Sequence, residues 1–328
     1  MKFNYKVDNE VKQEFLNTKP TATAKSEAFI LRSADDYEDL INKPIYNMTY
    51  AELKEMLAMK FKNTSLRTVL KNVSILKTYI DFCIDIKIVE HGENRLTSFS
   101  NEEAKEFVHQ QALLKKFTTK EKLKQYQKIL YNEQDQLIIE LPFIGCRGRT
   151  SNGNTLEEII NLSMNYVDEE NRRVTFVRNN GEHRIVQVEL STIELIKQTI
   201  EQEYYIENNG EITSNSRIPK PRALLINKVG NYVLRVPGKN KHQIFTANLL
   251  ASRIRRIAKY LGNPYITFTS LYQSGMVDSA LTIYKEKGDI TTKNYEDICE
   301  QFGFGDNPTK YWYTLKELTE QYIKILRI

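Results

Sequence analysis

The sequence contains an acid-free stretch, residues 212–277, which holds eleven Lys and Arg residues and no Asp or Glu. At the average acidic content of the chain, a stretch of this length would hold about eight carboxylates. The net charge of the whole chain is only +5, so its positive charge is concentrated in one part of the sequence. Such a concentration constrains this part to fold with a strongly cationic surface, which is typical of polyanion binding.

Within the acid-free stretch, residues 246–261 have the pattern of an amphipathic helix. Five residues at helical spacing form an apolar side: Leu250, Ile254, Ile257, Ala258 and Leu261. Five polar residues fall on the other side: Asn248, Ser252, Arg255, Arg256 and Lys259. Most basic stripes are ordinary solvated surfaces, but those usually mix both signs of charge. The absence of carboxylates therefore favours a phosphate-binding surface.

Length and composition indicate a globular protein. A chain of 328 residues with 41% hydrophobic content can bury substantial cores, and its length is typical of two or three domains. No apolar run approaches the roughly eighteen residues of a membrane span, and the amino terminus lacks the apolar core of a signal peptide. We therefore expect a soluble, cytoplasmic protein that makes no membrane contact.

The cysteines and histidines are scattered along the chain. They are Cys83, Cys146, Cys299, His91, His109, His183 and His242. No two of them stand at the spacing of metal ligands or of a disulfide framework. The sequence therefore predicts no disulfide, no metal site and no cofactor.

The first third of the chain reads as an arm followed by an all-α domain. Residues 1–23 are polar and predict an N-terminal arm, and residues 24–115 predict a small all-α domain. The helices expected in that domain cover 24–41, begin at 50, begin at 66 and cover 102–114. Residues 1–115 carry seventeen basic and seventeen acidic side chains, so the net positive charge lies in the remainder.

Residues 116–328 predict a mixed α and β domain that is mostly helical. Thr118 and Glu121 form a capping box before one helix, and a second helix ends at Gly145. Asn179–Glu182 joins two β-rich runs in a pattern typical of a hairpin. Ser191 is predicted to cap a helix that runs to about residue 205, and residues 223–236 are predicted to form another hairpin. The predicted fold class is mainly α with a smaller β component.

The order of these elements resembles that of the tyrosine recombinases, or phage integrases. A helix ending in Gly145-Cys-Arg147, a helix with a Glu-hydrophobic-hydrophobic pattern, a hairpin, a long helix and a final stretch with Gly303 and Tyr313 follow one another. The resemblance covers roughly residues 24–320. It implies an all-α core-binding domain followed by a mixed α+β catalytic-like domain. More narrowly, the chain resembles the integrase-like repressors of SPβ-type temperate phages, in which this fold serves regulation.

The resemblance assigns the family's catalytic positions to six residues: Arg147, Asn179, Thr269, Tyr272, Phe304 and Tyr313. Arg147 matches the first catalytic arginine, and Tyr313 stands where the nucleophile is expected. The other four depart from the family's pattern, in which a lysine, a histidine, a second arginine and a third histidine or tryptophan are expected. The family's acidic residue follows the first arginine by three positions, whereas Glu158 lies eleven positions after Arg147, which indicates an insertion beside the pocket.

These replacements remove the groups that would drive strand cleavage. Arginine forks stabilise the charge that develops on an attacked phosphodiester, and losing one such clamp typically costs about 10³-fold in rate. Without the lysine, the expelled oxygen has no proton donor. We interpret Tyr313 as an aromatic core residue and Arg147 as a phosphate contact or a member of a structural ion pair.

Three classes of function remain open. The first is a sequence-specific duplex-DNA-binding regulator, a phage repressor acting at operator sites without recombinase chemistry. The second is a working recombinase with relocated residues, such as Lys241, His242 or Arg253. The third is an RNA-binding or interaction module, which lacks a supporting aromatic platform in the sequence. A protein antirepressor or co-regulator is a further candidate partner, and the oligomeric state is left open.

The candidate DNA-binding residues lie in both predicted domains. In the first domain they are Arg67, Lys71 and Lys77. In the second they are Arg147, Arg149, Lys220, Arg222, Lys239, Lys241, Arg253, Arg255, Arg256 and Lys259. Because the two sets are far apart in sequence, we expect the domains to grip one duplex together as a clamp.

Overall fold

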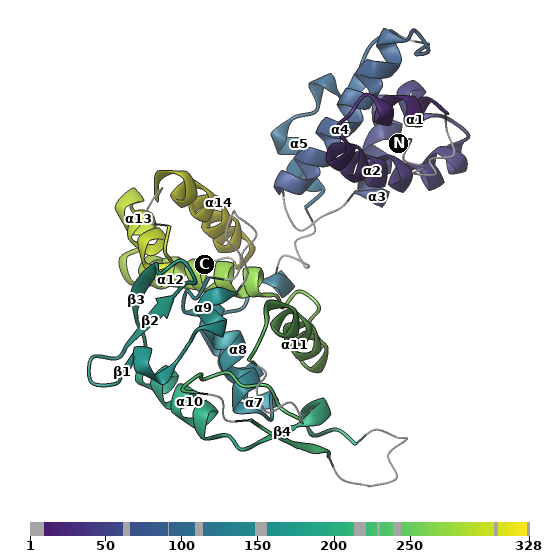
Figure 1. Cartoon of the computed structure of the whole chain (residues 1–328). Coiled ribbons are helices and arrows are strands. Elements are labelled where there is room, and N and C mark those ends of the chain that lie inside the picture. Colours follow the sequence, from purple (N-terminus) through teal and green to yellow (C-terminus); the bar gives the residue numbers. More distant parts are fainter. Residues whose placement is uncertain are drawn as a thin grey trace. The chain divides into compact units, whose positions relative to one another are not determined.

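A computed structural model describes residues 10–61, 66–90, 92–108, 114–147, 156–212, 221–227, 230–238, 244–304 and 308–326. The chain divides into two compact units, Met1–Leu113 and Leu114–Ile328. Helices dominate both units (Figure 1), and the strands of the described residues all lie in the second one. The predicted fold class, mainly α with a smaller β component, is confirmed for the described residues.

The N-terminal unit is helical throughout its described regular structure. Its α-helices are α1 (Glu10–Asn17), α2 (Thr21–Ile41), α3 (Tyr50–Lys60), α4 (Leu66–Asp85) and α5 (Asn101–Glu106). Helix α3 begins at Tyr50, as the sequence predicted, and Thr49 and Glu52 form a capping box at its start. The apolar stripe of α4 is buried at Val69, Val73 and Leu76, so this helix supplies much of the core.

The N-terminal arm expected over residues 1–23 is wrong for the part that the structure describes. Helix α1 packs onto α2, and its Phe15 and Leu16 are buried in the core of the unit. Lys12 is buried as well, because its ammonium group pairs with Asp35 at 2.5 Å and also with Glu38. This segment resembles a linker in sequence because it is polar. Its Lys12 can nevertheless be buried, because Asp35 and Glu38 of α2, more than twenty residues further along the chain, neutralise its charge.

The helix expected over residues 102–114 is shorter than predicted. Helix α5 ends at Glu106, where Phe107 forms its C-cap. Residues 109–113 lie outside the described part of the chain.

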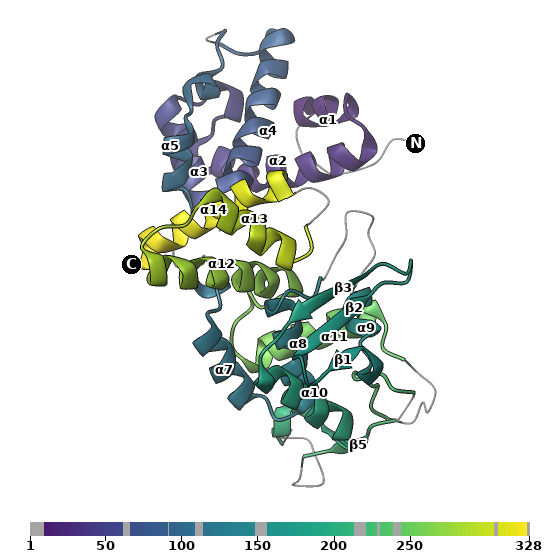
Figure 2. The same ribbon diagram turned by 90° about the vertical axis from the view of Figure 1, so that its left-hand side faces the viewer.

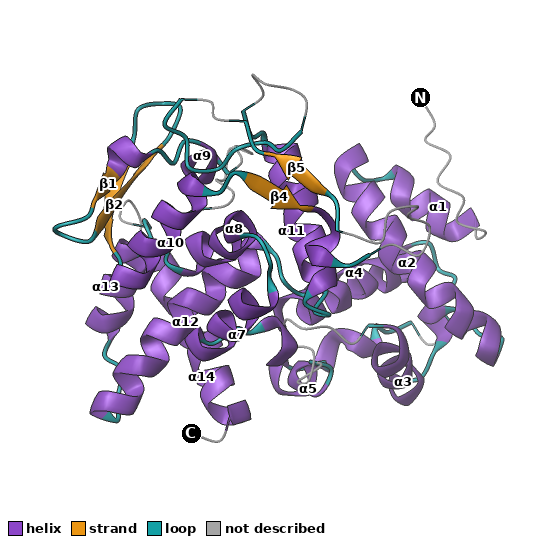
Figure 3. Ribbon diagram, turned by 90° about the horizontal axis from the view of Figure 1, so that it is seen from below, coloured by secondary structure: helices purple, strands orange, loops and turns teal. Residues whose placement is uncertain are grey.

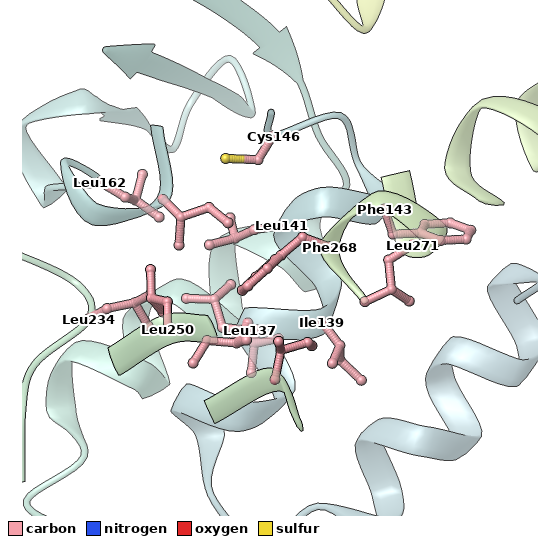
Figure 4. Packing of buried hydrophobic residues seen from close by; sticks show 14 of the residues in the cluster. Leu137, Ile139, Leu141, Phe143, Cys146, Leu162, Leu234, Leu250, Phe268 and Leu271 are labelled. Carbon is pink, nitrogen blue, oxygen red and sulfur yellow. The ribbon is translucent and has the colours of Figure 1, made fainter. Parts of the chain in front are cut away.

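The C-terminal unit is built around one central helix, α8 (Glu133–Phe143), which is buried along most of its length. Helices α7 (Lys120–Ile129), α10 (Leu190–Glu201), α11 (Ala247–Tyr260) and α12 (Phe268–Lys287) contact it. Figure 4 shows how Leu137 and Leu141 of α8 meet Leu250 of α11 and Phe268 of α12 in one apolar core. Helices α13 (Thr292–Gln301) and α14 (Pro308–Leu326) pack on each other and on α12.

Two small antiparallel sheets flank these helices, and Figure 3 shows them as separate pieces. The first has the order β1 (Val167–Asp168), β2 (Arg173–Val177) and β3 (His183–Gln187), and Figure 2 shows it beside the short helix α9 (Glu157–Ile160). The β2–β3 hairpin is confirmed, and its turn is closed by hydrogen bonds between Arg178 and Glu182 and between Gly181 and Arg178.

The second sheet corrects two predictions. Residues 204–206 form strand β4 (Tyr204–Ile206), which pairs with β5 (Ala223–Leu225). Among the described residues, the two arms of the hairpin predicted over 223–236 are joined by an isolated antiparallel bridge between Ile226 and Pro237, so the main partner of β5 is β4. Helix α10 consequently ends at Glu201, and its N-cap is Glu189, so Ser191 lies inside the helix. The pairing joins segments about twenty residues apart, and such long-range pairing overrides the local helical pattern.

The start of α7 and the end of α8 lie close to their predicted positions. Thr119, one residue later than expected, caps α7 by accepting a hydrogen bond from the Lys122 amide. Gly145 follows α8 with a φ of +107°, a conformation that glycine adopts readily and other residues avoid. No helix in the described part of the chain is long and apolar enough to cross a membrane.

Candidate functional site

Helix α11 presents a cationic face, which we define as Arg255, Arg256 and Lys259. Thr246 caps the helix through a hydrogen bond from the Leu249 amide. The apolar side, including Leu250 and Ile257, is buried in the core. All three cations of the face are exposed, and none has an ion-pair partner among the described residues.

Arg253 does not belong to this face, and its prediction as a DNA-binding residue is wrong for the structure described. Its side chain is only 2% exposed. The guanidinium lies 3.8 Å from the centre of the Tyr205 ring, and its Nε lies 3.6 Å from Asp135 Oδ1. The Tyr205 hydroxyl donates to the other Asp135 oxygen at 3.0 Å. Arg253 therefore links α11 to Asp135 of α8 and to Tyr205 of β4.

The remaining predicted DNA-binding residues differ in whether their side chains already have partners within the protein. Arg67 and Lys71 are exposed on α4 with no ion pair among the described residues, whereas the Lys77 ammonium donates to the Thr97 carbonyl at 3.3 Å. Arg222 is exposed and lies 3.5 Å from Glu207. Four candidates lie outside the described residues: Arg149, Lys220, Lys239 and Lys241.

The pocket that the resemblance identifies as catalytic is built around Arg147. Its backbone amide donates to Glu158 Oε2 at 2.7 Å, and its side-chain Nε donates to the Phe302 carbonyl at 3.4 Å. The guanidinium also lies 5.4 Å from the centre of the Phe304 ring. Gly303 leaves room for it, since a Cβ at that position would lie 2.7 Å from Arg147 Nε. Arg147 is thus half-buried and partly used by the fold.

Glu158 is the buried centre of this pocket, at 3% exposure. Arg184 of β3 donates to both of its oxygens, at 3.2 and 2.7 Å, and Arg178 Nε lies 3.4 Å away. Arg184 also donates to the carbonyls of Gly145 and Gln301. The guanidinium of Arg184 therefore has four acceptors within the protein, and little of its donor capacity is left for a substrate phosphate.

Aromatic residues occupy the positions where the resemblance implies the second arginine and the third histidine or tryptophan. The Tyr272 ring packs edge-on against Phe302 and Phe304, at centroid distances of 5.3 and 6.0 Å. Its hydroxyl donates to the Phe302 carbonyl. Burial raises the pKa of the Tyr272 phenol well above its ordinary value, although Arg184 and Arg147 oppose the shift. Tyr272 is therefore a neutral structural donor at neutral pH.

Asn179 and Thr269, two further positions that depart from the family's pattern, are exposed. Asn179 accepts a hydrogen bond from the Asn161 side chain at 2.8 Å, and its backbone amide donates to Glu157 at 3.1 Å. Thr269 is exposed in the first turn of α12. Neither side chain is a general acid that could protonate a leaving group.

Tyr313 is not the core residue that we interpreted it to be, because it is 56% exposed on α14. The aromatic side chain of α14 that meets the pocket is Tyr311, whose ring lies 4.0 Å from that of Phe304. Residues two positions apart on a helix point in nearly opposite directions. Tyr313 therefore faces away from Phe304 and from the arginine that Phe304 covers.

The described residues contain no cluster of His, Cys, Asp or Glu side chains arranged to hold a metal ion. Cys83, Cys146 and Cys299 are free thiols, and all three are buried. Burial raises the pKa of the Cys146 thiol, and the nearby Glu158 carboxylate acts in the same direction. This cysteine, next to Arg147, is an inert packing group.

Comparison with known families places this architecture. Residues 117–328 match the family described as MrpR, C-terminal catalytic domain, and residues 6–85 match MrpR, N-terminal core-binding domain. The chain belongs to the MrpR family. The predicted two-domain architecture, similar to that of the tyrosine recombinases, is therefore confirmed.

The MrpR-family chain is also similar to individual proteins. It is 23% identical, over 299 residues, to the SPbeta prophage-derived uncharacterized protein YopR of Bacillus subtilis (strain 168), and the match covers 90% of this chain and 88% of YopR. Among solved structures, the XerA recombinase matches with a TM-score of 0.40 and 14% identity, over 97% of this chain and 94% of that one. The Tn1549 transposon integrase in complex with transposon right end DNA matches with a TM-score of 0.45 and 13% identity, over 94% and 93%.

Sequence reasoning missed the convergence of Arg178 and Arg184 on Glu158. One signal could have revealed it. Arg184 and Val186 are two residues apart on β3, so their side chains lie on the same face of the strand. Since Val186 is buried, Arg184 points inward and needs a buried counter-ion.

Proposed function

We propose that this protein is a sequence-specific, double-stranded DNA-binding regulator that uses a recombinase fold without strand-cleaving chemistry. In a bacterial host it would act in the cytoplasm as a phage repressor that maintains lysogeny at operator sites. Its similarity to a prophage-derived protein supports the phage context. The observation that carries the proposal is the cationic face of α11, where Arg255, Arg256 and Lys259 are exposed without ion-pair partners among the described residues.

The chemistry of this face suits a duplex backbone. Lys and Arg that neutralise phosphates release condensed counter-ions, and this release supplies much of the affinity of DNA-binding proteins. No carboxylate occurs in residues 212–277 to repel the phosphates. On α4, Arg67 and Lys71 offer a second exposed cationic pair, which supports a grip on DNA by both units.

The arrangement of side chains around Arg147 supports the proposal that the protein does not cleave DNA strands. Most donors of Arg184 are engaged within the fold, Tyr272 stands where a second phosphate clamp is expected, and Tyr313 faces away from Phe304. A phosphodiester at this place would meet Arg147 without a second arginine fork and without a proton donor for the leaving oxygen.

The experiment that tests the regulator is selection from genomic DNA. The purified protein is mixed with fragments of its host and prophage genome at about 150 mM salt, and the retained fragments are sequenced. We expect a few sites upstream of prophage genes to be strongly enriched. Uniform retention of all fragments would reduce the protein to a non-specific binder, and preference for single-stranded RNA over duplex DNA would overturn the proposal.

A nicked suicide substrate carrying an enriched site tests the missing chemistry. We expect no covalent protein–DNA complex from the wild-type chain, and we expect the Tyr313→Phe variant to bind DNA within about threefold of wild type. A covalent complex that disappears in Tyr313→Phe would instead identify a working recombinase. A complex that survives in Tyr313→Phe but disappears in Tyr311→Phe would identify one with a relocated nucleophile.

A further inference from the structure

A surface pocket of about 490 Å³ lies at the C-terminal end of α11, between this helix and the connection to α12. Ile254 and Ala258 of α11 and Ile266 of the connection form its buried apolar floor. Its volume falls within the range of small-molecule sites, roughly 300–1,000 Å³. No part of the proposed regulator role assigns a ligand to this pocket.

The polar groups of the floor are already satisfied within the protein. Asn263 donates to the Lys115 carbonyl at 2.9 Å and to the Tyr126 hydroxyl at 3.0 Å, and its oxygen accepts from the Tyr265 amide at 3.1 Å. Thr267 caps α12 by accepting from the Ser270 amide at 3.0 Å. A ligand therefore meets apolar atoms in the floor and few free hydrogen-bonding groups.

Two basic residues of α11 contribute to the lining of the pocket. Arg255 and Lys259 line it, and they stand one helical turn apart, which puts their Cβ atoms about 5–6 Å from each other. Arg255 uses its Nε in a hydrogen bond to the Ala251 carbonyl at 3.0 Å. Neither residue has an ion-pair partner among the described residues, so neither charge is neutralised beside this apolar pocket.

We infer that this pocket binds a small organic anion, an apolar body with a carboxylate, that fills the floor and pairs with Arg255 and Lys259. A hydrated phosphate of DNA matches Arg255 and Lys259 but leaves the apolar floor unfilled, whereas a neutral apolar molecule leaves the two cations unneutralised. Only a ligand that is both apolar and anionic satisfies both parts of the pocket.

Occupation of the pocket has a regulatory consequence, which rests on the proposed function. Arg255 and Lys259 belong both to the pocket lining and to the cationic face of α11. A carboxylate paired with them removes two of the three charges that this face offers to a duplex. The ligand and DNA therefore compete, and a repressor of this kind is released from its operator when the ligand accumulates.

Octanoate is a suitable probe, with acetate and 1-octanol as matched ligands that lack the apolar body or the charge. Equilibrium dialysis of the full-length protein should show saturable binding of one octanoate per chain, and at least tenfold weaker binding of acetate and of 1-octanol. The double variant Arg255→Gln/Lys259→Gln should weaken octanoate binding about tenfold, because exposed ion pairs contribute up to about fivefold each. No saturable binding, equal affinity for 1-octanol, or full affinity in the double variant would overturn the inference.

Two further variants separate the pocket from the DNA face. Ala258→Leu fills the floor, so it should reduce octanoate binding and leave DNA affinity within about threefold of wild type. Arg256→Gln removes an exposed cation outside the pocket, so it should keep octanoate binding and weaken DNA binding. If Arg256→Gln, together with the double variant, leaves DNA affinity unchanged, the proposed function fails while the pocket stands. If octanoate binds the pocket but does not displace DNA, the competition is wrong.

Discussion

Two cationic regions of the C-terminal unit differ in where their positive charge is neutralised. Around Glu158, Arg184 and Arg178 are paired inside the fold, and two backbone carbonyls accept further hydrogen bonds from Arg184. On α11, the cationic face has no carboxylate partner among the described residues. Charge that is satisfied internally holds a structure together, whereas charge left unpaired at the surface is available to a partner.

The largest effect in this comparison should come from Glu158→Gln. The variant leaves the half-buried Arg184 without its counter-ion and leaves Arg178 with only the exposed Glu182, and removing the buried partner of an ion pair typically costs about 3–5 kcal/mol of unfolding free energy. Urea unfolding followed by circular dichroism measures it. The matched control is Glu182→Gln, which removes the exposed partner of Arg178 and should cost below about 1 kcal/mol. Equal losses in the two variants would show that Glu158 is not the structural centre.

Breaking the buried ion pair between Arg253 of α11 and Asp135 of α8 should reduce stability somewhat less than Glu158→Gln does. Arg253→Met leaves Asp135 buried without its cation, and we expect a loss of about 3 kcal/mol in unfolding free energy, which the double variant Arg253→Met/Asp135→Leu largely restores. DNA affinity of the folded double variant should stay near wild type. A large loss of affinity with unchanged stability in Arg253→Met would return Arg253 to the DNA-binding set.

The stability that Arg253→Met loses relative to wild type should depend on pH. Burial raises the pKa of Asp135 above its ordinary 3.8, and Arg253 opposes the shift. Between the unfolded and the folded pKa, the folded state binds more protons, so this group lowers stability as pH rises through that window. Without Arg253 the folded pKa rises further, and the stability deficit of Arg253→Met should shrink as the pH is lowered from 7 toward 5. A deficit that grows on acidification would contradict this account of Asp135.

The N-terminal unit extends the comparison with a smaller expected effect. If Arg67 and Lys71 contact phosphates, the variant Arg67→Ala/Lys71→Ala should bind DNA roughly tenfold more weakly. Its plot of log affinity against log salt should flatten by about 1.8, or 0.9 for each contact. Lys105→Ala is the matched control, since Lys105 is exposed in the same unit but already pairs with Glu102 at 2.6 Å. Equal binding by all three proteins would count against a clamp formed by both units.

The parts of the fold that sequence predicted well are those set by local patterns. Helix α11 was predicted with an apolar and a polar face, because the spacing of Leu250, Ile254 and Ile257 acts within a few turns. The β2–β3 hairpin was predicted for the same reason, since its turn residues and strands are adjacent in the chain.

The parts that sequence missed depend on partners far along the chain. Nothing near Arg253 in the sequence announces Asp135 or Tyr205, more than forty residues away, so a buried arginine looked like part of a basic stripe. Strand β4 was hidden because its pairing with β5 overrides a helical pattern. Tyr313 was misjudged because its exposure depends on how α14 packs, with Tyr311 turned toward Phe304.

The central claim is that the unpaired cations of α11 bind duplex phosphates, and the salt dependence of Arg255→Ala/Arg256→Ala tests it most directly. Affinity is measured for wild type and variant on an enriched site and on random duplex DNA across a salt series, with the thermal transition as a check of folding. We predict an intact transition, weaker binding to both DNAs, and a plot of log affinity against log salt that is flatter by about 1.8 on each. Unchanged affinity and unchanged slope on both DNAs, with the transition intact, would contradict the claim.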